Sequence, residues 1–198
     1  MSSTVDKAAA AELLRKQIRE IETADRAGDG IESRSCPSSI PAIWKPAVNK
    51  AMNLLLYRPR TEKELRDRLS GCGYEPNAVD FALNYVSYYG YLNDTRYAEG
   101  YVLSRGSGKS RSALRRELSV KGVDEASIEA AMELLETDER TIVEELLRKR
   151  YGMPHRMDER ELRRAAGYLG RKGFAVSLVW GALREYQNSA DSEPDELE

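Results

Sequence analysis

Several residue types that commonly build functional sites are scarce in this chain. It has one histidine, two cysteines, two tryptophans and two phenylalanines among 198 residues. The single histidine and the spacing of Cys36 and Cys72 match no zinc-ligand pattern, so we expect neither a metal nor a cofactor. Two cysteines also suit a reducing compartment. We interpret Cys72, which lies between two glycines, as a small apolar filler rather than as a nucleophile.

Long apolar runs and strand patterns are missing as well. No run approaches the about 18 apolar residues that a membrane helix needs. The first 20 residues, MSSTVDKAAAAELLRKQIRE, lack the apolar core of a signal peptide. No stretch of useful length alternates polar and apolar residues as a strand does. With 32% charged residues, the sequence predicts a soluble, cytoplasmic protein.

Charge is distributed unevenly along the chain. The net charge is −2, but the last nine residues, ADSEPDELE, carry five carboxylates and no base, which leaves +3 on the rest. The stretch 103–116 holds five basic residues and no acidic one. Such a stretch can meet phosphates or an acidic protein surface. A solvated helix face beside an acidic tail is the alternative, and charge alone leaves both open.

The chain repeats itself at intervals of about 50 residues. A pair of apolar residues four places apart precedes a glycine three times, as Leu65–Leu69–Gly73, Leu114–Leu118–Gly122 and Ala165–Leu169–Gly173. Further apolar residues stand six, nine and ten places after each glycine, namely Val79, Ala82, Leu83, Ile128, Ala131, Met132, Val179, Ala182 and Leu183. Coincidence in phase over this many positions indicates a repeated supersecondary unit.

Each repeat predicts two helices joined at the glycine. Apolar residues four apart lie on one helix face, and a glycine just past them can adopt the left-handed conformation that ends a helix. A third helical stretch precedes each pair, as AVNKAMNLLLY, TRYAEGYVLSR and ERTIVEELLRKRY. The sequence therefore predicts an all-α fold, a tandem array of three three-helix modules, elongated and curved.

We place the three modules at residues 46–92, 93–136 and 137–188. Residues 1–45 form an N-terminal extension with a possible helix and a linker, and 189–198 form the acidic tail. Thr61, Ser110 or its neighbour, and Asp124 are expected to cap helices. Trp44, in the linker, is expected to dock on the first module. Modules this small have modest cores, so we expect neighbours to share buried surface.

The stretch SRGSGKSRS, residues 104–112, resembles the end of a phosphate-binding loop. The full pattern, G-x-x-x-x-G-K-[ST], follows a strand. Here the position of the first glycine is Leu103, and the residues before the loop have helical spacing. We therefore interpret the stretch as a connection between two helices in which Gly106 and Gly108 permit the turn.

Six tyrosines gather near the junction of the first two modules: Tyr85, Tyr88, Tyr89, Tyr91, Tyr97 and Tyr101. Aromatic side chains beside basic ones can stack on exposed nucleic-acid bases. However, Tyr97 and Tyr101 are one helical turn apart, and such pairs usually pack between helices. We favour a module interface, and we expect His155 at the surface.

Four segments resemble the RecX family of bacterial recombination regulators. They are RPRTEKELRDRL, YGYLNDTRYAEGYVLSR, KSRSALRRELSVKGVDEASIEAAM and RAAGYLGRKGF. The segments occur in the family's order and cover all three modules, roughly residues 47–186. The tandem three-helix architecture is also the fold that this resemblance implies. The N-terminal extension and the acidic tail lie outside the resemblance.

The resemblance implies a non-enzymatic regulator that binds the RecA recombinase and its filament on single-stranded DNA. Family members typically limit filament growth and suppress ATP hydrolysis and strand exchange, and some bind DNA weakly. For this chain, inhibition of RecA is the expected outcome, with the protein acting as a monomer and away from membranes.

Basic side chains are the candidates for contact with RecA or DNA. The residues are Arg58, Arg60, Arg105, Lys109, Arg111, Arg115, Arg116, Arg148, Lys149, Arg150, Arg163, Arg164, Arg171 and Lys172. For each of them alone, a solvated helix residue is the favoured interpretation. For the middle cluster as a group, partner contact and solvation are equally favoured; its members are Arg105, Lys109, Arg111, Arg115 and Arg116.

Two other classes of function remain as alternatives. An enzyme would need paired carboxylates, a nucleophile with its base or a phosphate loop, and no such constellation stands out. A helical DNA-binding regulator acting without RecA is the second, since short helix pairs superficially resemble helix-turn-helix units. Such proteins concentrate base-reading side chains on one helix, whereas here the basic residues are spread over three modules.

Overall fold

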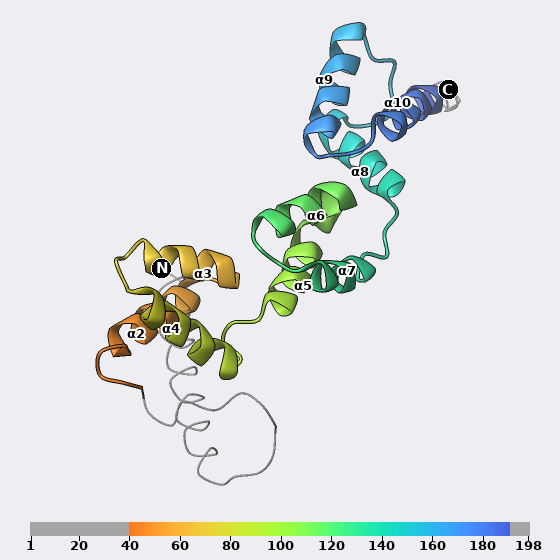
Figure 1. The fold of residues 1–198 in the computed structure, drawn as a ribbon. Helices are drawn as coiled ribbons and strands as arrows, with labels where there is room; N and C mark the ends of the chain where they lie inside the picture. Colours follow the sequence, from red (N-terminus) through yellow and green to blue (C-terminus); the bar gives the residue numbers. More distant parts are fainter. Residues whose placement is uncertain (1–39, 191–198) are drawn as a thin grey trace, which may run out of the picture. The chain divides into compact units, whose positions relative to one another are not determined.

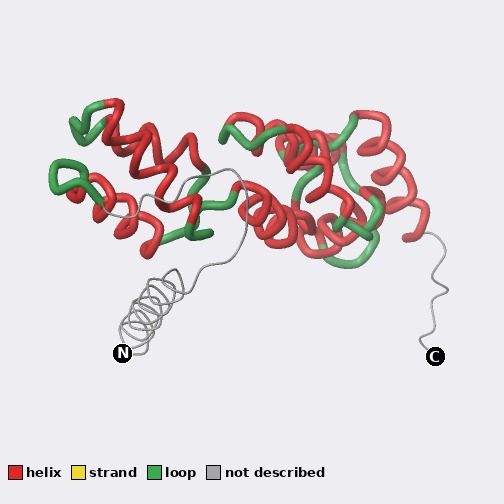
Figure 2. Tube along the Cα trace, turned by 60° about the horizontal axis from the view of Figure 1, so that its bottom comes forward, coloured by secondary structure: helices red, strands yellow, loops and turns green. Residues whose placement is uncertain are grey.

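The computed structural model describes residues 40–190, and within that range it contains nine α-helices, one short 3₁₀-helix and no strand (Figures 1 and 2). The possible N-terminal helix, most of the linker, Cys36 and nearly all of the acidic tail lie outside the described residues. The chain divides into two compact units, one ending at Asn93 and the other beginning at Asp94. The all-helical tandem fold is thus confirmed.

The helices fall into three consecutive groups of three. Group 1 contains α2 (Lys45–Tyr57), α3 (Glu62–Ser70) and α4 (Pro76–Tyr88). Group 2 contains α5 (Asp94–Arg105), α6 (Arg111–Val120) and α7 (Glu125–Glu133), with the 3₁₀-helix η2 (Gly106–Gly108) between α5 and α6. Group 3 contains α8 (Glu139–Tyr151), α9 (Glu159–Arg171) and α10 (Val176–Ala190). Group 1 lies in the first unit, and groups 2 and 3 together form the second.

Each group has an apolar core of its own. The fifteen apolar positions of the sequence repeat are all buried, with at most 3% of each residue exposed. They belong to three separate clusters, one for each group. The periodicity therefore identified the core-facing side of α3 and α4, of α6 and α7, and of α9 and α10.

The three repeated glycines have the conformation that the sequence predicts. Gly73, Gly122 and Gly173 have φ angles of 84°, 86° and 89°. Each amide donates a hydrogen bond of 2.9–3.0 Å to a carbonyl three residues earlier. A residue with a side chain is strained at such φ values, so glycine is what allows the tight turn between the two helices.

The predicted helix caps are confirmed. The side chains of Thr61, Ser110 and Asp124 accept hydrogen bonds from the amides of Glu64, Ala113 and Ser127, at 3.2, 3.1 and 2.9 Å. A side-chain cap of this kind stabilises a helix by about 1 kcal/mol. Helix starts are therefore fixed by short polar signals that are visible in the sequence.

Trp44 docks on group 1 as expected, with its ring centroid 4.9 Å from that of Phe81. The interpretation of Cys72 as an apolar filler is wrong: the residue is exposed. It follows the end of α3 in the turn that leads to α4, where the chain runs over the surface, so its side chain has no core to fill.

The clustered tyrosines pack inside their own groups. Tyr85 is buried in the core of group 1, and Tyr89 and Tyr91 pack against that core. Tyr97 and Tyr101 stack on each other in group 2, with ring centroids 6.0 Å apart, against the cluster that contains Leu114 and Leu118. Their rings therefore pack between helices of one group, and the module interface that we favoured stays a prediction.

Candidate functional site

The loop that resembles a phosphate-binding loop, residues 104–112, connects α5 to α6 within group 2 and contacts group 3. It follows α5 rather than a strand, which confirms its interpretation as a connection between helices. The amide of Ser110 donates to the carbonyl of Lys172 at 3.1 Å, and its hydroxyl donates to the carbonyl of Gly173 at 2.7 Å. The ammonium of Lys172 in turn donates to the carbonyl of Gly108 at 2.8 Å. The loop thus forms half of a joint with the turn between α9 and α10.

Small residues make this joint tight, and it is the buried surface that the two groups share. Ser110 and Ala113 are 1% and 3% exposed. A Cβ atom added to Gly173 would lie 2.6 Å from the Cβ of Ala113, and one added to Gly106 would lie 2.4 Å from a methyl carbon of Leu135. Gly173 is therefore required by close packing, whereas at Gly106 the contact is with the flexible end of the Leu135 side chain, which packs in group 2.

Two of the predicted contact residues hold group 2 together. The guanidinium of Arg111 donates to the carbonyl of Leu135, just beyond α7, at 2.5 Å and to that of Met132, in the last turn of α7, at 3.3 Å. The guanidinium of Arg115 forms a two-pronged pair with Glu129, also on α7. Arg116, by contrast, is exposed and has no ion-pair partner among residues 40–190.

Lys109 is engaged with a carboxylate on α6. Its ammonium pairs with Glu117, which also accepts a 2.6 Å hydrogen bond from the Tyr101 hydroxyl. Partial burial works to raise the pKa of Glu117, but the hydrogen bonds from Lys109 and Tyr101 outweigh it and hold this pKa below its usual value. Burial and the bond to Glu117 raise the pKa of Tyr101 to about 12. Lys109 therefore has an internal role.

Four arginine side chains line a groove between α8 and α9 of group 3. The groove has a volume of about 710 Å³. Its lining consists of Arg150, Tyr151, Glu161, Arg163, Arg164, Gly167 and Arg171. Four of these seven residues were candidates from the sequence, and the fold brings them together from two helices.

The groove arginines are mostly without counter-charges. Arg163 pairs with Glu159 on its own helix, and both side chains are more than 70% exposed, so the pair contributes little. No carboxylate of the described residues lies in ion-pair distance of Arg150, Arg164 or Arg171. The groove is therefore an electropositive surface, since its only acidic lining residue is Glu161.

Tyr168 provides an aromatic platform next to this groove. The guanidinium of Arg150 lies 4.4 Å from the Tyr168 ring centroid, and the ammonium of Lys172 lies 5.2 Å from it. Such cation–π contacts restrict the cations without neutralising them. The sequence did not single out Tyr168, because its importance depends on the packing of α8 against α9.

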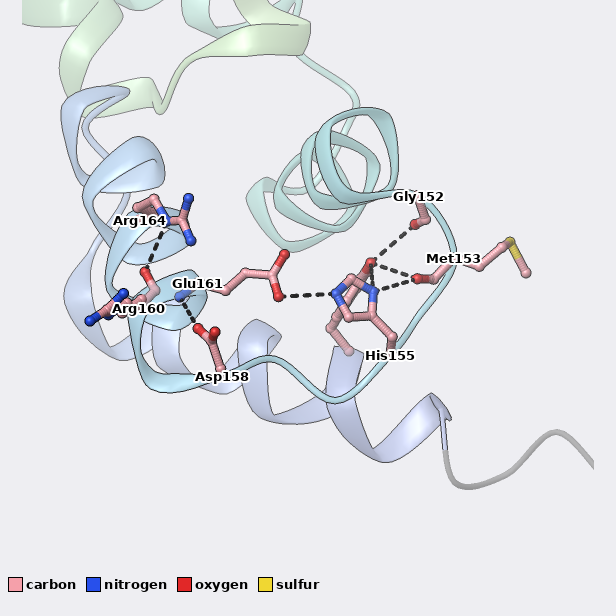
Figure 3. Close-up of polar contacts among 8 residues, drawn as sticks. Gly152, Met153, His155, Asp158, Arg160, Glu161 and Arg164 are labelled. Atoms are coloured by element: carbon pink, nitrogen blue, oxygen red, sulfur yellow. Dashed lines mark hydrogen bonds and ion pairs between the residues drawn. The ribbon is translucent and has the colours of Figure 1, made fainter.

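The single histidine, His155, lies next to the side-chain carboxylate of Glu161. Figure 3 shows the Glu161 side chain reaching from α9 to the His155 ring, where its carboxylate lies 3.2 Å from Nε2. The Nδ1 atom lies 3.1 Å from the carbonyl of Met153, and the Tyr186 hydroxyl of α10 donates to the same carbonyl at 2.8 Å. His155 is thus half-buried in a polar network and is more than the simple surface residue that we expected.

The hydrogen bond to Met153 and then the one to Glu161 raise the pKa of His155. Burial and the charge of Glu161 raise the pKa of Tyr186. Glu161 contributes to both shifts as the second cause, since its carboxylate favours positive charge and disfavours further negative charge near it.

The remaining candidates are dispersed. Arg148 and Lys149 are exposed on α8, and Lys149 lies 3.7 Å from Glu145. Arg105 lies over the Tyr101 ring at 4.8 Å from its centroid. Arg58 and Arg60 belong to the first unit; Arg58 is exposed, and the buried Nε of Arg60 has no hydrogen-bond partner there.

Neither a metal-ligand cluster nor a membrane-spanning helix is found in the described part of the chain. No group of three or more histidine, cysteine, aspartate or glutamate residues there could hold a metal ion. Among the helices of residues 40–190, none has the length and apolar character needed to cross a membrane.

Comparison with protein families gives two matches. The first three-helix domain of RecX matches residues 47–85, and its second three-helix domain matches residues 93–132. These ranges coincide with groups 1 and 2 of the structure to within a few residues.

Known proteins extend the similarity. The chain is 38% identical over 155 residues to the regulatory protein RecX of Amycolatopsis mediterranei (strain U-32), an alignment that covers 75% of this chain and 89% of the relative. It is 32% identical over 163 residues to the regulatory protein RecX of Bacillus subtilis (strain 168), covering 77% and 60%. The crystal structure of RecX from Lactobacillus salivarius superposes with a TM-score of 0.57 at 26% identity, over 74% of this chain and 97% of that one.

Proposed function

The chain belongs to the RecX family of regulatory proteins, and we propose that it binds RecA and its filament on single-stranded DNA and inhibits ATP hydrolysis and strand exchange. The observation that carries this proposal is the extent of the similarity, which reaches 89% of the length of a regulatory protein RecX. The proposed role is non-catalytic, exercised by a monomer in the cytoplasm.

We propose that the contacts to the partner come from the exposed basic side chains that have no internal carboxylate. These are Arg116 of α6 and Arg148, Arg150, Arg164 and Arg171 of group 3, with Arg105 and Arg58 as further contributors. An arginine of this kind already faces water, so it can pair with an acidic protein surface or a phosphate without first breaking an internal ion pair. Lys109, Arg111, Arg115 and Lys172 have internal partners instead.

ATP hydrolysis by RecA tests the proposal. RecA of the same bacterium is assembled on single-stranded DNA, and this protein is added from substoichiometric to equimolar amounts. We expect hydrolysis to fall at substoichiometric amounts, because a filament can be limited at few positions. Unchanged hydrolysis at equimolar protein would overturn the proposal.

Variants connect the inhibition to the proposed contacts. The triple variant Arg150→Ala/Arg164→Ala/Arg171→Ala should need at least about fivefold more protein for half-inhibition, since charge at an interface governs association. Arg184→Ala is the matched control, because Arg184 is exposed on α10 of the same group and does not line the groove. Equal inhibition by the triple variant and the control would exclude the groove from the contact.

A further inference from the structure

The groove between α8 and α9 carries an excess of positive charge, which favours binding of an anion. Four guanidinium groups and one carboxylate line it, and three of the four arginines have no carboxylate partner in the described residues. Arginine presents a planar fork of N–H donors that matches two oxygens of one phosphate. A groove of about 710 Å³ has room for several phosphate groups.

We propose that this groove is a binding site for phosphate groups, and that the protonated His155 ring strengthens it by holding and neutralising Glu161, the one carboxylate in its lining. Phosphate binding of this kind concerns the chain alone and can be tested without RecA. The phosphate groups can belong to a nucleic-acid backbone or to a free oligophosphate, since both present the same oxygens.

The two hydrogen bonds of the His155 ring, to Met153 and to Glu161, form together only when the ring is doubly protonated. The carbonyl of Met153 can only accept a hydrogen bond, so Nδ1, 3.1 Å away, must carry a proton. The Glu161 carboxylate, when ionised, is also an acceptor, so Nε2 at 3.2 Å must carry one too. A neutral imidazole has only one N–H, and it would lose one of these two hydrogen bonds.

The surroundings of the ring identify Glu161 as its counter-charge. From α9 it faces Glu161, from α10 the Tyr186 hydroxyl at 3.4 Å from Nδ1, and from its own loop the Met153 carbonyl. Tyr186 also donates to the carbonyl of Gly152, at the end of α8, so the hydroxyl is held near the ring. Tyr186 is neutral at ordinary pH, because its pKa is raised.

Proton loss from His155 changes the charge that the groove presents. With the ring protonated, Glu161 is offset and the four arginines act as four positive charges. With the ring neutral, the charge of Glu161 cancels one of the four positive charges, and the groove keeps a net charge of three. The pKa of His155 is raised, so the protonated state persists above the usual value of 6.5 and is lost as the pH rises through the folded-state pKa. Phosphate affinity should therefore be higher below that pKa.

The size of the effect follows from Coulomb's law. One unit of charge at about 8 Å in a medium of high dielectric constant changes the affinity for one phosphate about twofold. Two or three bound phosphates, partly screened by salt, give a change of about threefold to tenfold between pH 6 and pH 8.

The first experiment measures binding of a fluorescent oligothymidylate without terminal phosphates, whose diester charge stays constant between about pH 6 and pH 8. At low salt we expect the full-length protein to bind about threefold to tenfold more tightly at pH 6. His155→Gln should bind at both pH values as the unaltered protein does at pH 8. Glu161→Gln should bind at pH 8 as the unaltered protein does at pH 6. A pH step of unchanged size in His155→Gln would overturn the role of the histidine.

The second experiment identifies the site and the source of the phosphate. Arg150→Ala/Arg164→Ala/Arg171→Ala should lose at least about tenfold in affinity for the oligothymidylate, and Arg184→Ala should lose little. Competition by inorganic tripolyphosphate at pH 7 separates the sources. Displacement at low concentration indicates a free oligophosphate, and displacement only by nucleic acid indicates the backbone. Equal affinities of the triple variant and the control, or no binding of either probe, would overturn the site.

A third measurement controls for folding. His155 is the single histidine, so the proton on its Cε1 atom gives one NMR signal whose titration reports the pKa of His155 in each variant. We expect that pKa to fall in Glu161→Gln, because the carboxylate is removed. Far-ultraviolet circular dichroism confirms that each variant keeps its helices. Loss of RecA inhibition with intact phosphate binding would count against the proposed function alone, and the converse against the phosphate site alone.

Discussion

Substitution of Gly173 by alanine is the sharpest test of the joint between groups 2 and 3. Gly173 has a φ of 89°, and an added Cβ would lie 2.6 Å from the Cβ of Ala113 and 2.7 Å from the hydroxyl oxygen of Ser110. Gly73 is its counterpart in group 1, with a φ of 84°, but nothing lies within 4 Å of an added Cβ there. The pair thus shares the backbone strain and differs in the steric overlap.

The expected losses of unfolding free energy follow from these two contributions. A positive φ costs an alanine about 1–2 kcal/mol relative to glycine. Overpacking against Ala113 and Ser110 adds about 1–3 kcal/mol. Gly73→Ala should therefore destabilise its unit by about 1–2 kcal/mol, and Gly173→Ala should destabilise its unit by about 2–5 kcal/mol.

Urea denaturation followed by tryptophan fluorescence can measure the two units separately. The chain has two tryptophans, and Trp44 lies in the first unit and Trp180 in the second. Gly173→Ala is measured in a Trp44→Phe background, and Gly73→Ala in a Trp180→Phe background. Equal losses for the two glycine variants would refute the conclusion that the joint is closely packed at Gly173.

Two further predictions concern group 2 and its joint. Ser110→Ala should lower the free energy of unfolding by about 2 kcal/mol and Asp124→Ala by about 1 kcal/mol, because Ser110 both caps α6 and donates to Gly173, whereas Asp124 caps α7. Equal losses in urea titrations would show that the hydrogen bond from Ser110 to Gly173 does not stabilise the protein. Glu117→Gln should lower the pKa of Tyr101 from about 12 toward 10.0, since the charge of Glu117 helps to raise it; an unchanged midpoint in an ultraviolet absorbance titration would leave burial as the sole cause.

The fold was predictable because its signals are local. Apolar residues at helical spacing and a glycine after the first helix of each pair both act within a few residues. The same pattern occurs three times, so chance is a poor explanation for it. The structure buries each of the fifteen apolar repeat positions, and the caps at Thr61, Ser110 and Asp124 form as predicted.

The candidate site was predictable only as a list of basic residues. The sequence could not separate Arg111, which donates to carbonyls at the C-terminal end of α7, from Arg116, which has no ion-pair partner in the described chain. It could not pick out Glu161 or Tyr168, because neither belongs to a recognisable motif. The composition of the groove depends on which turns of α8 and α9 face each other.

The sequence by itself determined the helical class, the repeated three-helix unit and the positions where helices begin and end. These properties depend on neighbours within one or two helical turns, so the apolar periodicity and the short polar capping motifs of the sequence are enough to predict them. The tertiary structure alone decided which cations are engaged and which are available. Lys172 meets the carbonyl of Gly108 across 64 positions of sequence, and Tyr186 lies beside His155 across 31. Such contacts arise from the packing of helices that are distant in the chain, and no local pattern encodes them.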